Sequence, residues 1–139
     1  TANLCLHTTL FPGMAELLAT LEARNISWGV VTNKPARFTE PLLELLGLSK
    51  RAASIISGDT CAHPKPHPEP LLRAAREIGV TPQSCLYVGD AERDIEAARA
   101  AGMAALIADY GYLSAADRPE TWGADGRIGT PLGILAFLP

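Results

Sequence analysis

Two acidic side chains, Asp90 and Asp94, follow a short apolar run over 85–89 that is typical of a buried strand. The residues over 95–101 then have the pattern of a helix. Open parallel sheets bind their ligands just beyond the carboxyl ends of strands. Carboxylates in that place suit Mg²⁺, which takes one or two of them together with waters and a substrate phosphate. Asp90 and Asp94 are therefore candidate metal ligands, while a turn residue and a helix-start residue are the alternative use of the same pair.

Two other polar groups follow earlier apolar runs. Thr32 and Asn33 come directly after the strand predicted over 26–31, where a hydroxyl, an amide and backbone N–H groups can hold an anionic oxygen. A helix N-cap is the alternative use of Thr or Asn there. Lys65 lies in the stretch 63–70, in which four prolines alternate with other residues and stiffen the backbone. Hydroxyl, ammonium and carboxylate groups thus follow successive strands, a combination that suits a phosphate bound beside a metal.

The elements that must position these groups alternate along the chain. Apolar runs predict strands, and helical spacing predicts helices between them. Together they predict an α/β fold with a doubly wound, mostly parallel sheet. Pro41 falls inside one helical stretch and either kinks it or restarts it. The predicted strands cover 26–31, 53–57, 85–89 and 104–108, the helices cover 14–24, 35–46, 71–78, 95–101 and 132–138, and the predicted core includes Leu17, Leu21, Leu42, Leu45, Leu71 and Leu72.

Composition limits the class of protein. The chain has 139 residues, 47% of them hydrophobic, which is enough for one domain with a core. Its net charge of -3 offers no footprint for nucleic acid or an anionic membrane, and no apolar run is long enough for a membrane span. Three cysteines without a CxxC motif indicate free thiols, so a reducing, cytoplasmic location is expected.

The motifs resemble those of the haloacid dehalogenase superfamily of phosphatases, whose core is Rossmann-like. Thr32, within Val-Val-Thr-Asn-Lys, matches the second motif, whose Thr or Ser binds the transferring phosphoryl group. Lys65, before Pro66, matches the third motif, whose lysine neutralises charge. Asp90 and Asp94 match the fourth motif, whose acids hold Mg²⁺. The resemblance therefore implies Lys65 and Thr32 as catalytic residues, Asn33 beside them as a phosphate contact, and Mg²⁺ as cofactor.

Four further stretches resemble the phosphoglycolate phosphatase branch of that superfamily, which includes relatives acting on N-acetylmuramic acid 6-phosphate. The implied activity is hydrolysis of a small phosphorylated metabolite through an aspartyl-phosphate, and no nucleic acid or membrane partner is expected. These stretches are Leu10-Phe11-Pro12-Gly13, Thr32-Asn33-Lys34-Pro35, Gly58-Asp59-Thr60 and Tyr110-Gly111-Tyr112.

The first motif of the superfamily, Asp-x-Asp on the central strand, has no counterpart here. The aspartates stand at 59, 90, 94, 109, 117 and 125, and no two of them are separated by one residue. We expect a C-terminal fragment, with 1–12 a remnant of the cap and linker and 13–139 an incomplete, inactive core. The resemblance implies an empty position mid-sheet, between the strands over 26–31 and 85–89. Unpaired backbone there would favour closure of the gap or self-association through it.

Three alternative interpretations of these residues remain. A natural phosphate- or metal-binding module without hydrolysis would use the same groups. A phosphoacceptor receiver domain also combines Asp, Thr and Lys, but there the paired acids follow the first strand, whereas Lys65 here precedes the strand that ends before Asp90. Cys61, His63 and His67 could bind zinc, which usually takes four ligands.

Overall fold

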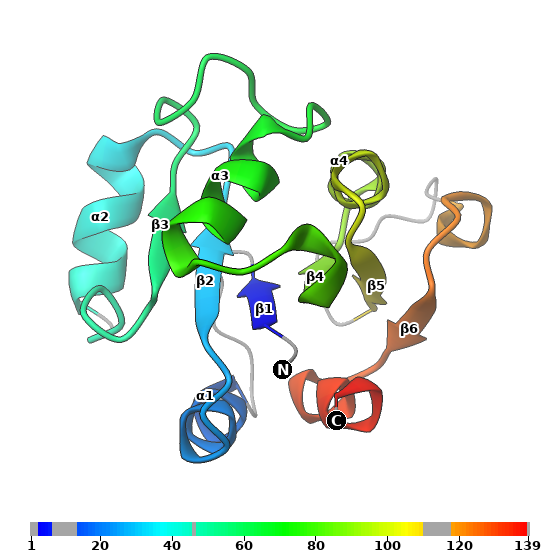
Figure 1. The fold of residues 1–139 in the computed structure, drawn as a ribbon, viewed down its shortest axis with the longest axis horizontal. Helices are drawn as coiled ribbons and strands as arrows, with labels where there is room; N and C mark the ends of the chain where they lie inside the picture. Colours follow the sequence, from blue (N-terminus) through cyan, green and yellow to red (C-terminus); the bar gives the residue numbers. More distant parts are fainter. Residues whose placement is uncertain (1–2, 7–13, 46, 110–117, 139) are drawn as a thin grey trace.

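The computed structural model is a six-stranded parallel β-sheet with helices on both faces (Figure 1). It describes residues 3–6, 14–45, 47–109 and 118–138. The order of strands across the sheet is β3-β2-β1-β4-β5-β6. The strands are β1 (Asn3–Leu6), β2 (Trp28–Val31), β3 (Ser54–Ile56), β4 (Cys85–Gly89), β5 (Ala104–Ala108) and β6 (Gly126–Ile128). The doubly wound α/β class predicted from the sequence is confirmed.

Helices cover the two faces because successive strand residues point to opposite sides. Val30 packs with α1 and η3 on one face, and Val31 packs with α3 and α4 on the other. Figure 1 shows the same division, with α2 at the edge of the sheet beside β3. The helices are α1 (Met14–Ala23), α2 (Ala36–Leu45), α3 (Glu69–Ile78) and α4 (Glu92–Ala101), and the 3₁₀ segments are η1 (Pro82–Ser84), η2 (Pro119–Thr121) and η3 (Pro131–Phe137). In the described residues, no helix is both long and apolar enough to cross a bilayer.

The strand β1 corrects the expectation of an empty central position. It pairs in parallel with β2 on one side and with β4 on the other. Backbone groups make these pairs, so an extended segment can fill a vacant place in a sheet whatever the role of its side chains. The described strands therefore leave no gap between β2 and β4 through which a second copy could join the sheet.

Three other details differ from the sequence analysis. Leu45, expected in the core, is 85% exposed, because α2 turns Thr39 and Leu43 toward the protein instead. The helix α2 continues through Pro41 without a restart. Strand β6 was not among the predicted strands. The turns at 10–13 and 110–112 fall outside the described residues.

The pairing of β1 can be tested with proline. Cys5 is in register with Gly29 on one side and Tyr87 on the other. Cys5→Pro removes an N–H from the middle of the sheet and should lower the free energy of unfolding by about 2–4 kcal/mol, measured by urea denaturation. Cys5→Ala is the control, since it changes the side chain and keeps the N–H. Equal unfolding midpoints for the two variants would contradict the central placement of β1.

Candidate active site

The ammonium group of Lys65 lies buried beneath the carboxyl ends of β2 and β4. It donates to Asp94 Oδ1 at 2.5 Å, to Tyr87 Oη at 2.8 Å and to the carbonyl of Val31 at 3.4 Å. Residue Lys65 is only 5% exposed. A buried charge is stable only when it is paired and hydrogen-bonded, and these acceptors match the three donors of an ammonium group. The side chain is thus held in one position from three sides.

Asp94 links Lys65 to the end of β4. One carboxylate oxygen accepts from Lys65, and the other accepts from the backbone N–H groups of Asp90 and Ala91, each at 3.1 Å. Gly89 makes this possible, because a Cβ there would come within 2.3 Å of the Cβ of Asp94. Glycine at position 89 therefore leaves room for the Asp94 carboxylate beside the backbone of residues 89–91. The Asp94 side chain therefore ties the first turn of α4 to the two residues that follow β4.

The backbone of Lys65 is fixed by the amide of Asn33. The Asn33 side chain donates to the Lys65 carbonyl and accepts from the Lys65 N–H, both at 3.1 Å. These bonds join the loop after β2 to the proline-rich loop that precedes α3. Thr32 is buried beside them, and its hydroxyl accepts from the N–H of Lys34 at 3.2 Å. The structure thus brings the loop of Thr32 and Asn33 together with the loop of Lys65.

The stretch Gly58-Asp59-Thr60 has a positioning role at this rim. The N–H of Gly58 donates to the carbonyl of Lys34 at 2.7 Å, and a Cβ at Gly58 would come within 2.0 Å of the carbonyl oxygen of Asn33. Asp59 accepts from the N–H of Ala36 at 2.9 Å, in the first turn of α2. These contacts and the role of Tyr87 were not predicted, because a tyrosine inside an apolar strand carries no polar signal.

The donor set for a metal ion differs from the prediction in one respect. Both oxygens of Asp94 already accept hydrogen bonds from the protein, so its carboxylate fits a positioning role better than direct coordination. Asp90 is half-buried directly after β4, which keeps it at the predicted rim. Within the described part of the chain, no group of three His, Cys, Asp or Glu side chains could hold a metal ion.

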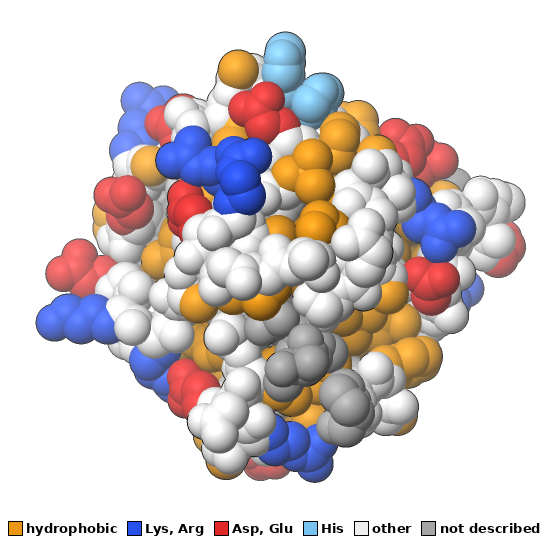
Figure 2. Space-filling model, in the orientation of Figure 1, with side chains coloured by type: hydrophobic (Ala, Val, Ile, Leu, Met, Phe, Trp, Pro, Cys, Tyr) orange, Lys and Arg blue, Asp and Glu red, His pale blue; other side chains and the backbone are white. Residues whose placement is uncertain are grey.

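That finding also removes support for zinc at Cys61, His63 and His67. Figure 2 shows histidine side chains together at the surface of the molecule. The rings of His63 and His67 stack with centroids 4.6 Å apart, and His67 Nδ1 accepts from the N–H of Glu69. Cys61 and Cys85 are free thiols, as expected. Burial raises the pKa of both, which disfavours the thiolate that binds metals.

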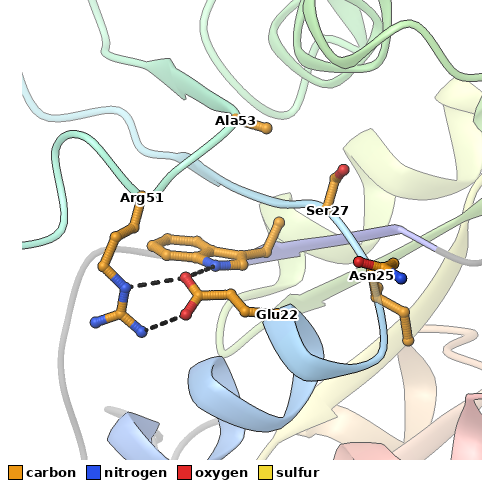
Figure 3. A pocket seen from close by; sticks show the side chains of 7 residues that line it. Glu22, Asn25, Ser27, Arg51 and Ala53 are labelled. Carbon is orange, nitrogen blue, oxygen red and sulfur yellow. Dashed lines mark hydrogen bonds and ion pairs between the residues drawn. The ribbon is translucent and has the colours of Figure 1, made fainter.

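A pocket of about 300 Å³ lies at the opposite end of β2 (Figure 3). There the carboxylate of Glu22 accepts from the indole N–H of Trp28 and from two nitrogens of Arg51. The hydrogen bond from Arg51 lowers the pKa of Glu22. These side chains are hydrogen-bonded to one another, and none of the predicted site residues lines the pocket. The pocket is lined by Glu22, Asn25, Ile26, Ser27, Trp28, Arg51 and Ala53.

Residues 2–108 match the protein family described as haloacid dehalogenase-like hydrolase. The chain is 49% identical over 128 residues to N-acetylmuramic acid 6-phosphate phosphatase of Pseudomonas putida, covering 92% of this chain and 57% of that protein. It is 51% identical over 121 residues to phosphoglycolate phosphatase of Xylella fastidiosa, covering 87% of this chain and 53% of that protein. The chain thus spans about half the length of these curated relatives.

Solved structures agree with the fold. A crystal structure from Haemophilus somnus, described as a predicted phosphoglycolate phosphatase, superposes with a TM-score of 0.85 at 31% identity. That match covers 93% of this chain and 57% of the other. A hydrolase from Geobacter sulfurreducens gives a TM-score of 0.77 at 30% identity, covering 92% of this chain and 55% of the other.

Removing the charge of Lys65 should leave the buried carboxylate of Asp94 without a positive partner. Lys65→Met is expected to lower the free energy of unfolding by about 3–5 kcal/mol, because Asp94 then has no partner for its charge. Urea denaturation measures the loss. Arg73→Met is the control, since it breaks the exposed pair with Glu77 and should cost below about 0.5 kcal/mol.

The double variant Lys65→Met/Asp94→Asn separates charge from packing. It removes both charges and keeps an oxygen for the N–H groups of Asp90 and Ala91. Part of the lost stability should therefore return. A single variant as stable as the Arg73→Met control would show that the ion pair is not buried as described.

Proposed function

We propose, because the chain belongs to the haloacid dehalogenase-like hydrolase family, that it forms the core of a phosphatase for small phosphorylated metabolites. The observation that carries the proposal is the buried ammonium group of Lys65, fixed at the strand ends beside Thr32 and the acidic pair. A cation fixed at that place can neutralise phosphoryl charge as it develops. Phosphoryl transfer depends mainly on such positioning.

Each residue in the proposal has one role. Lys65 neutralises the charge of the phosphoryl group and its attacking carboxylate, and Thr32 with nearby backbone N–H groups orients the phosphoryl oxygens. Asn33 holds the loop of Lys65 and lies beside the phosphate. Asp90 would hold Mg²⁺, and Asp94 keeps Lys65 and the loop of Asp90 in place. The metal, when bound, would supply positive charge to the phosphate oxygens.

The nucleophile in this proposal is a carboxylate that the described residues do not provide. The aspartyl-phosphate route needs an acid at the end of the central strand, where the family has Asp-x-Asp. Strand β1 fills that place with Asn-Leu-Cys-Leu, which contains no acid. We therefore propose that the 139-residue chain on its own does not turn over substrate.

The similar proteins suggest two candidate substrates for the proposed phosphatase. Phosphoglycolate and N-acetylmuramic acid 6-phosphate are the substrates that the names of the similar proteins give. The identities of 49% and 51% do not separate them, so the proposal covers both.

The test compares this chain with a longer protein built from it. In that protein, the part of the Pseudomonas putida relative that this chain does not cover is joined to this chain. With Mg²⁺, the joined protein should release phosphate from at least one of the two substrates, and the chain alone should release none. Lys65→Ala in the joined protein should lower kcat by about 100-fold or more.

Lys50→Ala is the matched control, since Lys50 is exposed and lies outside the site. Its kcat should equal that of the parent protein. Loss of the same size in both lysine variants, or no phosphate release from either substrate, would contradict the proposal. Binding of phosphate without turnover would instead favour the non-catalytic module.

A further inference from the structure

The outer side of α2 carries an exposed row of apolar side chains. Phe38 is 58% exposed and Leu45 is 85% exposed, and Pro41 between them is exposed as well. Phe38 and Leu45 are seven residues apart, which is close to two helical turns, so they share one side of the helix. Figure 1 shows α2 at the margin of the molecule, beside β3. We call Phe38, Pro41 and Leu45 the α2 row.

Two opposite charges flank the α2 row on the same side. Arg37 and Glu44 are both exposed and, like Phe38 and Leu45, are seven residues apart. The guanidinium carbon of Arg37 lies 4.8 Å from the ring centroid of Phe38, which holds this charge against the row. A positive group therefore stands near the start of α2 and a negative group near its end, along one apolar edge.

This arrangement is complementary to itself. A twofold axis through the middle of α2 would bring Phe38 onto Leu45 of a second copy and Arg37 toward Glu44 of that copy. The midpoints of the two pairs differ by one residue, or about 1.5 Å of helix rise, so one axis serves both. Such an interface is isologous, with the same surface on both subunits.

We propose that two copies of this chain associate through an antiparallel pairing of their α2 helices. Contact between the rows removes the two most exposed large apolar side chains of the described residues from water. The Arg37 and Glu44 pairs set the direction, because a parallel pairing would place like charges together. A ten-residue helix is about 15 Å long, so the interface is small and the dimer is weak.

Sedimentation velocity over about 10 µM to about 1 mM protein tests the dimer. The sedimentation coefficient should rise with concentration toward that of a dimer. Leu45→Asp should weaken association at least about 100-fold, because it places a charge in the row. Its fold should be intact by circular dichroism, since Leu45 makes little contact in the monomer.

Charge exchange tests the direction of the pairing. Arg37→Glu and Glu44→Arg should each weaken association about tenfold, since each places like charges together across the axis. The double variant Arg37→Glu/Glu44→Arg should restore it. Glu96→Arg is the matched control, because Glu96 is an exposed acidic residue on α4 and not on α2.

A monomer at every concentration would overturn the proposal. So would a dimer that Leu45→Asp leaves unchanged, since its interface would lie elsewhere. A double variant as weak as the single ones would exclude the antiparallel pairing. A Glu96→Arg effect as large as that of Glu44→Arg would show a general charge effect rather than this interface.

Discussion

The buried contact between Lys65 and Asp94 is the constraint on which the rim of the sheet depends. Neither charge is stable in the interior alone, and the pair is stable only if the remaining donors and acceptors also find partners. Tyr87 and the Val31 carbonyl complete the shell of the ammonium group, and backbone N–H groups complete that of the carboxylate. Gly89 is required because the carboxylate must pass close to the chain. The ion pair thus constrains residue types in β4, in the first turn of α4 and in the loop of Lys65.

The central strand shows a second constraint, which concerns the backbone. Strands β2 and β4 are separated by one strand position in the sheet order, and their inward N–H and C=O groups need partners wherever the partners come from. Asn3–Leu6 meets that requirement in register with both neighbours. The pairing completes the sheet at whose edge Lys65 is held, yet it brings no carboxylate to the strand end. At this position, backbone pairing in the sheet therefore does not depend on a carboxylate side chain.

Much of this arrangement could be predicted from the sequence, because local patterns of apolar and polar residues indicate where strands and helices lie. Apolar runs ending in polar residues located β2 and β4, and with them Thr32 and Asp94. Long-range contacts were less accessible. Nothing in the sequence near Asn33 indicates that its amide pairs with the backbone of Lys65, 32 residues away. The place of β1 was missed because its pairing depends on a vacancy in the sheet and not on its own pattern. Leu45 was misassigned because a leucine at helical spacing usually faces the core.

The shell of Lys65 also determines how the site could meet a phosphate. Its three donors are engaged by the protein, so an oxygen that reached Nζ would have to replace one of the acceptors. The contact with Asp94, at 2.5 Å, is charge-assisted and the strongest of the three. The carbonyl of Val31 is the farthest, at 3.4 Å, and it also accepts from Tyr87 at 3.3 Å. It would therefore give way first, and Tyr87 would keep that carbonyl partnered while Asp94 kept the ammonium group in place.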